Sequence, residues 1–120
     1  MRSGKDTPKI KDGALLSAAL TEMTEKGLGF TAIISAENAP IGVFTDGDLR
    51  RTFAKGIYTA TTKINDVMHA NPSTINANQL AVEAVEMMEQ KKINGLLVVD
   101  DAGQLVGAFN MHDLLKAKVV

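Results

Sequence analysis

The residues best suited to hold a ligand follow a short apolar run, at Thr45-Asp46-Gly47-Asp48. We expect a helix to begin here. The first turn of a helix presents unpaired N–H groups and a partial positive charge, which suit a phosphate or a carboxylate. A carboxylate in that turn, such as Asp48, can also accept hydrogen bonds from vicinal sugar hydroxyls. The same residues form a common capping pattern, in which Thr45 or Asp46 caps the helix and Asp48 complements its dipole, and residue chemistry alone favours capping.

Charged side chains near this segment could add affinity for an anion. Arg50 and Arg51 carry guanidinium groups whose geometry matches phosphate and carboxylate, although an exposed helix face explains Arg50 equally well. His112 lies at the corresponding place in the second half of the chain, where a surface histidine is the more frequent explanation. These residues extend the candidate site without establishing it.

Catalytic and metal chemistry find little support in these residue types. The chain has no cysteine, and its two histidines, His69 and His112, are 43 positions apart without metal-ligand spacing. The sequence contains no G-x-S-x-G nucleophile elbow, no phosphate-binding P-loop and no G-x-G-x-x-G motif. We therefore predict no catalytic residue, no metal site and no required cofactor, and we expect that this chain is not itself an enzyme.

Composition limits the remaining classes of function. The chain has 120 residues, of which 45% are hydrophobic and 4% aromatic, enough for one compact and mainly aliphatic core. Its net charge of -1, from 13 basic and 14 acidic residues, disfavours nucleic acid as a partner. No apolar stretch approaches the roughly 20 residues that span a bilayer, and the first residues do not resemble a signal peptide. We expect a cytoplasmic protein that binds neither nucleic acid nor membrane.

The elements that must position the candidate residues occur twice. When the sequence is compared with itself at an offset of 65 positions, identical residues coincide along both halves, without a gap from residue 10 to residue 49. The identities include Gly42 with Gly107, Phe44 with Phe109, Asp48 with Asp113, Ile10 with Ile75, Ala19 with Ala84, and Met23 with Met88. The chain is therefore a tandem duplication.

A long amphipathic helix is predicted near the start of each copy. Leu15, Ala19 and Met23 are spaced four apart, which stacks them on one helical face. Gly27 can end this helix. The second copy repeats the spacing with Leu80, Ala84 and Met88.

A hairpin and a short helix are predicted after each long helix. Apolar runs at 31–35 and 41–45, and again at 96–99 and 105–109, are joined by polar turns. Because these runs are almost continuously apolar, we expect both faces of each sheet to be covered. The short helices are predicted from Asp46 to about Ala54 and from Met111 to about Ala117, and an extended piece around Ile10 or Ile75 precedes each long helix.

These elements make two α/β units of order βαββα. We assign residues 1–54 to the first unit, 55–63 to a Thr-rich linker and 64–120 to the second unit, which opens with one helical turn at Ile64–Met68. One unit is too small to bury its apolar helix face alone. We therefore expect the two copies to pack about a pseudo-twofold axis as a single folding unit.

The end of each hairpin resembles the signature of the CBS domain. The first copy carries the full apolar-Gly-apolar-apolar-Thr-x-x-Asp run at Ile41–Asp48. The second copy carries it in part at Val106–Asp113, with Asn110 in place of the usual Thr or Ser. The resemblance implies a CBS pair with two clefts, which in this family often hold adenine or other nucleotides.

The resemblance also implies roles for particular residues. Asp48 and Asp113 would bind a ribose, Thr45 and Asn110 would lie near the phosphate or sugar, and Thr74 would line a cleft. The full predicted set of ligand-binding residues is Thr45, Asp46, Gly47, Asp48, Arg51, Thr74, Asn110, His112 and Asp113.

A closer resemblance concerns Gly42–Arg51 together with Met111–Leu115. These segments look like the C-terminal CBS pair of bacterial arabinose-5-phosphate isomerases, which act in the Kdo branch of lipopolysaccharide synthesis. The resemblance implies that a sugar isomerase domain, absent from these 120 residues, is attached in the full-length protein. It implies a regulatory CBS pair that binds a nucleotide or nucleotide-sugar, either CMP-Kdo or an adenine nucleotide, and that forms a homodimer. The alternative is a ligand-free structural module that holds the oligomer of the same isomerase together.

Overall fold

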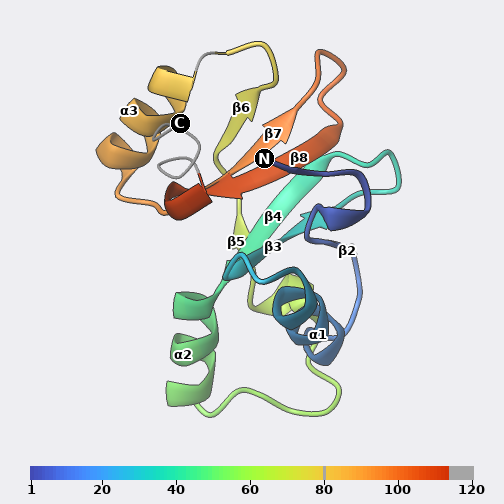
Figure 1. Ribbon diagram of the computed structural model, residues 1–120. Helices are drawn as coiled ribbons and strands as arrows, with labels where there is room; N and C mark the ends of the chain where they lie inside the picture. Colours follow the sequence, from blue (N-terminus) through green and yellow to red (C-terminus); the bar gives the residue numbers. More distant parts are fainter. Residues whose placement is uncertain (80, 114–120) are drawn as a thin grey trace.

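The computed structural model describes residues 1–79 and 81–113, and in these ranges the strands form two four-stranded sheets (Figure 1). One sheet has the strand order β1-β8-β7-β6 and the other β2-β3-β4-β5. α3 lies beside the first sheet, and α1 and α2 lie beside the second. In chain order the elements are β1 (Arg2–Ser3), η1 (Gly4–Asp6), β2 (Lys9–Lys11), α1 (Leu16–Lys26), β3 (Phe30–Ile34), β4 (Pro40–Thr45), α2 (Asp46–Ala54), η2 (Ile64–Asp66), β5 (His69–Ala70), β6 (Thr74–Asn76), α3 (Ala81–Lys91), β7 (Gly95–Val99) and β8 (Leu105–Asn110).

The two sheets have the same pairing, which confirms the predicted duplication. In the first hairpin Thr31 lies opposite Phe44, and in the second, 65 positions later, Leu96 lies opposite Phe109. The parallel pairing of β2 with β3 recurs between β6 and β7 at the same offset. Each hairpin also has a register irregularity at equivalent positions near its turn. The chain is therefore an α/β protein of two βαββα repeats, as predicted.

Apolar side chains fill three layers, one between the sheets and one between each sheet and its long helix. The central layer contains Phe30 and Ala32 of one sheet against Leu97 and Ala108 of the other. All five residues of β3 and the three central residues of β7 are buried. The prediction that both faces of each sheet are covered is thus confirmed.

The buried face of α1 differs from the predicted one at its first position. Gly27 ends α1 as predicted, with φ of 69° and its N–H donated to the Met23 carbonyl. Ala19 and Met23 are buried, but the assignment of Leu15 to this face is wrong, because Leu15 is 42% exposed while Leu16 is fully buried. Leu15 is the N-cap and has extended backbone, so helical spacing does not apply to it.

The second copy follows its prediction over the residues that the structure describes. Ala84 and Met88 form the buried face of α3, and Leu80 lies outside the described residues. Residues 111–113 are helical, and the remainder of the helix predicted to Ala117 lies outside the described part of the chain. Over residues 1–79 and 81–113, none of the helices combines the length and the apolar character that crossing a membrane requires.

Each sheet is completed by a short edge strand that leads into the other repeat. β1 pairs with β8, and β5 pairs with β4. We call this arrangement the exchange of edge strands. The glycine of each repeated motif makes room for it, since a Cβ atom on Gly42 would lie 2.4 Å from Met68 Sδ. A Cβ atom on Gly107 would lie 2.9 Å from the Arg2 carbonyl oxygen. Ile64 of η2 likewise packs in the core of the first repeat, so the segment 64–70 lies against the first repeat although it follows the linker.

Candidate functional site

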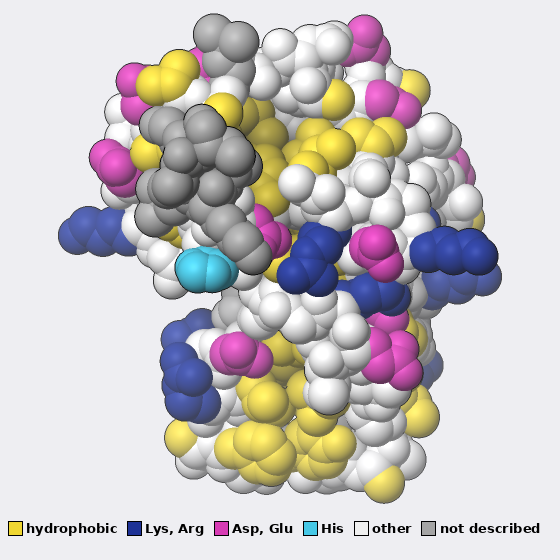
Figure 2. Space-filling view, viewed as in Figure 1, with side chains coloured by type: hydrophobic (Ala, Val, Ile, Leu, Met, Phe, Trp, Pro, Cys, Tyr) yellow, Lys and Arg dark blue, Asp and Glu magenta, His cyan; other side chains and the backbone are white. Residues whose placement is uncertain are grey.

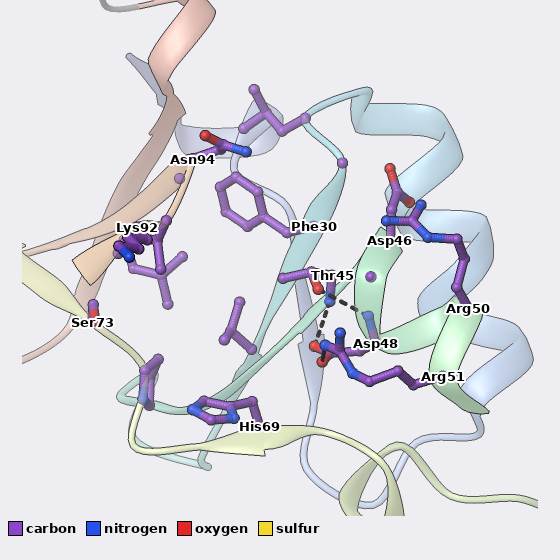
Figure 3. Close-up of a pocket in the computed structure, with 18 of the residues that line it drawn as sticks. Phe30, Thr45, Asp46, Asp48, Arg50, Arg51, His69, Ser73, Lys92 and Asn94 are labelled. Carbon is purple, nitrogen blue, oxygen red and sulfur yellow. Dashed lines mark hydrogen bonds and ion pairs between the residues drawn. The ribbon is translucent and has the colours of Figure 1, made fainter. Parts of the chain in front are cut away.

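A cleft of about 670 Å³ lies at the seam between the two repeats, beside the N-terminus of α2 (Figure 3). The first repeat lines it with residues 28–30 before and at the start of β3, with the end of β4, and with the first turns of α2. The second repeat lines it with β5, the segment 71–73 and residues 92–95 at the start of β7. Five of the predicted ligand-binding residues line this cleft, namely Thr45, Asp46, Gly47, Asp48 and Arg51.

Thr45 and Asp48 form a reciprocal capping box at the start of α2. The Asp48 N–H donates to Thr45 Oγ1 at 3.1 Å, and the Thr45 N–H donates to Asp48 Oδ2 at 2.9 Å. The box satisfies backbone donors that the start of a helix would otherwise leave unpaired. The capping explanation of these two residues is confirmed, and any contact with a ligand must be additional to it.

Asp48 keeps capacity for such a contact. Its other oxygen, Oδ1, pairs with Nη2 of Arg51, which lies one turn further along the same helix. The Asp48 side chain is 14% exposed and lies at the edge of the cleft. The capping box and Arg51 fix its orientation there. A carboxylate offers about four lone-pair positions, and the hydrogen bonds to described residues use two of them. Asp48 is therefore a preorganised acceptor.

The neighbouring residues of α2 complete this wall of the cleft. The Asp46 N–H donates to the Gly29 carbonyl at 3.0 Å, which ties the start of α2 to the start of β3. The side chains of Asp46 and Arg50 are exposed and also line the cleft. This wall thus combines acidic and basic groups with a helix N-terminus, an arrangement suited to a polar ligand that carries both hydroxyls and an anionic group.

The opposite wall carries polar residues that the sequence analysis did not assign. His69, Ser73, Lys92 and Asn94 line the cleft from the second repeat, and Figure 3 shows Asn94 and Lys92 across from Thr45 and Asp48. Lys92 adopts the left-handed conformation, with φ of 56°, in the turn between α3 and β7. The predicted residue Thr74 is not among the lining residues, although its neighbour Ser73 is. The duplication could have pointed to Lys92 and Asn94, because packing of the two repeats brings the segments before β3 and β7 together at the seam.

The floor of the cleft is apolar and contains a buried aromatic ring. Phe30, Val43 and Leu97 line it, and Figure 3 shows the Phe30 ring between the two polar walls. A Cβ atom on Gly95 would lie 2.4 Å from Phe30 Cε1, so the glycine makes room for the ring. A mostly apolar floor with a few polar groups at the rim is typical of pockets for small organic ligands.

The remaining predicted residues belong to the second repeat and lie away from this cleft. The Asp113 N–H donates to Asn110 Oδ1 at 2.7 Å, which reproduces one half of the capping box of the first repeat. The Asp113 carboxylate lies 3.6 Å from Arg2 Nε, and His112 is exposed. In the described part of the chain, no cluster of three or more His, Asp or Glu side chains is arranged to hold a metal ion.

The model of the CBS domain family matches this chain twice, at residues 4–55 and at residues 64–120. This chain belongs to the CBS domain family. The two matched segments correspond to the two repeats, and the cleft lies at the seam of the resulting CBS pair.

The CBS pair is similar to part of a set of curated isomerases. It is 45% identical over 120 residues to the protein named Arabinose 5-phosphate isomerase KdsD of Pseudomonas aeruginosa, and 41% identical over 120 residues to the protein of the same name in Escherichia coli K12. The chain covers only 37% and 36% of the length of these relatives. The match falls in their C-terminal part, so the chain is a CBS domain pair and does not correspond to a whole isomerase.

Solved CBS structures share the fold. The structure described as CBSX2 in complex with AMP has a TM-score of 0.82 at 21% identity, with 99% of this chain and 92% of that chain covered. PAE2072 from Pyrobaculum aerophilum, complexed with AMP, has a TM-score of 0.83 at 19% identity, with 100% of both chains covered. At these identities the likeness establishes the arrangement of the CBS pair.

Proposed function

We propose that this CBS pair is a ligand sensor that binds a nucleotide or nucleotide-sugar in the cleft beside α2. The observation that carries the proposal is the preorganised Asp48 carboxylate at the rim of a cleft with an apolar floor. Asp48 accepts the hydrogen bonds of a ribose, and the floor around Phe30 receives the base. The AMP complexes of two similar CBS proteins support this class of ligand.

The basic side chains at the rim select an anionic ligand in this proposal. Arg50 and Arg51 flank one wall, and His69 and Lys92 flank the other. A phosphate group at the mouth of the cleft would meet positive charge from both repeats, and guanidinium groups bind phosphate with matched geometry. A ligand held from both sides would join the two repeats across the seam.

The partner of this sensor is an arabinose-5-phosphate isomerase domain in the same polypeptide. The chain spans little more than a third of the length of its curated relatives, which leaves room for such a domain. Feedback within the Kdo branch favours CMP-Kdo as the ligand, and adenine nucleotides are the competing choice. Regulation further requires that the ligand bind two states of the full-length protein with different affinities.

Calorimetric titration of the 120-residue chain tests the proposal. CMP-Kdo, CMP, AMP and ATP are titrated separately, at one salt concentration, into the wild type and into a Lys92→Ala variant. We expect saturable binding of at least one of them, weakened in Lys92→Ala because the variant removes a cation from the rim. As a matched control, Lys11→Ala removes the same charge from an exposed position of strand β2 and should bind like the wild type. Absence of binding by all four ligands would reject the sensor.

A structural role is the second candidate function, and one observation favours it. Phe53, at the end of α2, is 58% exposed and stacks on Tyr58 with ring centroids 5.1 Å apart, and the neighbouring Ile57 is 46% exposed. Figure 2 shows hydrophobic side chains gathered at the lower end of the molecule, over α2 and the loop that follows it. A homodimer of CBS pairs would cover this surface. Sedimentation of the wild type and of Phe53→Ser tests it, since a dimer that does not depend on Phe53 would reject this surface.

A further inference from the structure

The turn after α3 holds a lysine in a backbone conformation that favours glycine. Lys92 directly follows α3 and has a φ of 56°, in the left-handed region. Its N–H donates to the Glu89 carbonyl at 3.3 Å, and the next N–H, that of Ile93, donates to the Met88 carbonyl at 3.0 Å. These two hydrogen bonds form a Schellman helix end, where glycine is the usual residue because a Cβ atom is unfavourable in this conformation. Lys92 therefore lowers the stability of this helix end.

The equivalent helix end of the first repeat does have the glycine. At the offset of 65 positions Lys92 corresponds to Gly27, which has a φ of 69°. Among the described residues, a Cβ atom on Gly27 would have no neighbour within 4 Å, so glycine there serves the backbone conformation and not close packing. The difference between the repeats has a counterpart in the site, because Lys92 lines the cleft and Gly27 does not. Unfavourable backbone conformations of this kind cluster at binding sites.

Lys92 also decides the sign of the charge that lines the cleft. On the α2 wall two carboxylates and two guanidinium groups balance one another, and Arg51 is already paired with Asp48. The described residues that line the cleft from the second repeat include no carboxylate. Counting His69 as neutral, the ammonium group of Lys92 gives the whole lining its net positive charge. None of the ion pairs between described residues involves Lys92, so this cation is open to a ligand.

We infer that Lys92 determines the specificity of the cleft for anionic ligands, and that the second repeat places a lysine there, at a loss of stability, to distinguish a nucleotide from the uncharged nucleoside. The inference rests on the proposed function and deepens it, because it assigns the choice of ligand charge to one residue. Lys92 lies across the cleft from Asp48 (Figure 3). A ligand that contacts both therefore bridges the repeats, with hydroxyl groups toward α2 and its anionic group toward the turn after α3.

Three variants of Lys92 separate its backbone conformation from its charge. Lys92→Gly removes both the unfavourable conformation and the cation, Lys92→Ala removes the cation alone, and Lys92→Arg keeps both. In thermal unfolding we expect Lys92→Gly to melt about 2–5 °C above the wild type, and the other two to melt within about 2 °C of it. The matched control Gly27→Ala places a Cβ atom at the equivalent helix end and should lower the melting temperature by a similar amount. A Lys92→Gly variant that melts no higher than the wild type would overturn the inference.

Calorimetric titration of the same samples with AMP and with adenosine measures the specificity. Lys92→Gly and Lys92→Ala should bind AMP about three- to tenfold more weakly than the wild type and bind adenosine equally well. Lys92→Arg and Gly27→Ala should keep the wild-type preference for AMP. An unchanged preference for AMP in both Lys92→Gly and Lys92→Ala would overturn the inference while leaving the sensor intact.

A second measurement tests Lys92 if no nucleotide binds the wild type, a result that would reject the proposed function. The melting temperature is measured in sodium pyrophosphate and in sodium chloride of equal ionic strength. An anion that binds the folded chain at Lys92 stabilises it, so pyrophosphate should raise the melting temperature of the wild type more than that of Lys92→Ala. Equal rises in the two proteins would overturn the inference by themselves.

Discussion

Replacing Asp48 with asparagine separates its structural role from its role in binding. The Asp48→Asn substitution keeps the size and one oxygen of the side chain but removes its charge. In the structure the carboxylate accepts from the Thr45 N–H and pairs with Arg51. The amide oxygen of the introduced asparagine can still accept from the Thr45 N–H, so the capping box should survive, and the main loss is the ion pair with Arg51.

The expected effects on stability and affinity differ in size. The Arg51 side chain is 66% exposed, so its ion pair contributes only about 0.2–1 kcal/mol to stability. Hydrogen bonds to a charged group contribute about 1.5–3 kcal/mol, and a loss of about 1.4 kcal/mol weakens binding tenfold. We therefore expect Asp48→Asn to lower the melting temperature by no more than about 5 °C and to weaken nucleotide binding by about tenfold or more.

Thermal unfolding followed by circular dichroism and calorimetric titration of the same samples provide the two readouts. Asp66→Asn is the matched control, because Asp66 is an exposed carboxylate of η2 outside the residues that line the cleft. An Asp48→Asn variant that binds like the wild type while melting lower would show that Asp48 serves only to cap α2. That result would exclude a role for the Asp48 charge in nucleotide binding.

Three further predictions concern the packing that builds the seam, each measured by urea unfolding. Gly95→Ala should destabilise the chain by about 1–3 kcal/mol, because its Cβ atom would lie 2.4 Å from the Phe30 ring, and Phe30→Leu should relieve part of this loss. Gly42→Ala should lower the free energy of unfolding by less than Gly95→Ala, because the atom that its Cβ meets is the sulfur of the flexible Met68 side chain. Equal losses of stability at Gly42 and Gly95 would contradict this explanation. Met88→Ala should cost about 2–5 kcal/mol because its side chain is buried under β7, and a loss below about 1 kcal/mol would contradict that placement.

The repeated elements could be predicted because each one carries a local pattern. The offset of 65 positions, the apolar hairpin strands and the Gly27 helix end are visible in the sequence and occur in the structure. α2 begins at Asp46 and ends at Ala54 as expected, because its capping box is a sequence motif. Leu15, which was wrongly assigned to the buried face of α1, lies outside the helix, where periodicity carries no information.

The exchange of edge strands could not be predicted in the same way. β1 and β5 have two residues each, too few for any periodic pattern, and each pairs with a strand that is distant in the chain. The pairing of Arg2 with Asp113 and the placement of His69 in the cleft both follow from that exchange. Lys92 and Asn94 were missed for a similar reason, since they become neighbours of Thr45 only when the two repeats pack together.

A crystal structure of the chain grown with a saturating nucleotide is the decisive test of ligand binding beside α2. We expect density for the ligand in the cleft beside α2, with the ribose hydroxyls within hydrogen-bond distance of the Asp48 carboxylate and the phosphate near Arg50, Arg51 or Lys92. Ligand bound elsewhere on the molecule, with the cleft beside Asp48 filled by solvent alone, would contradict it.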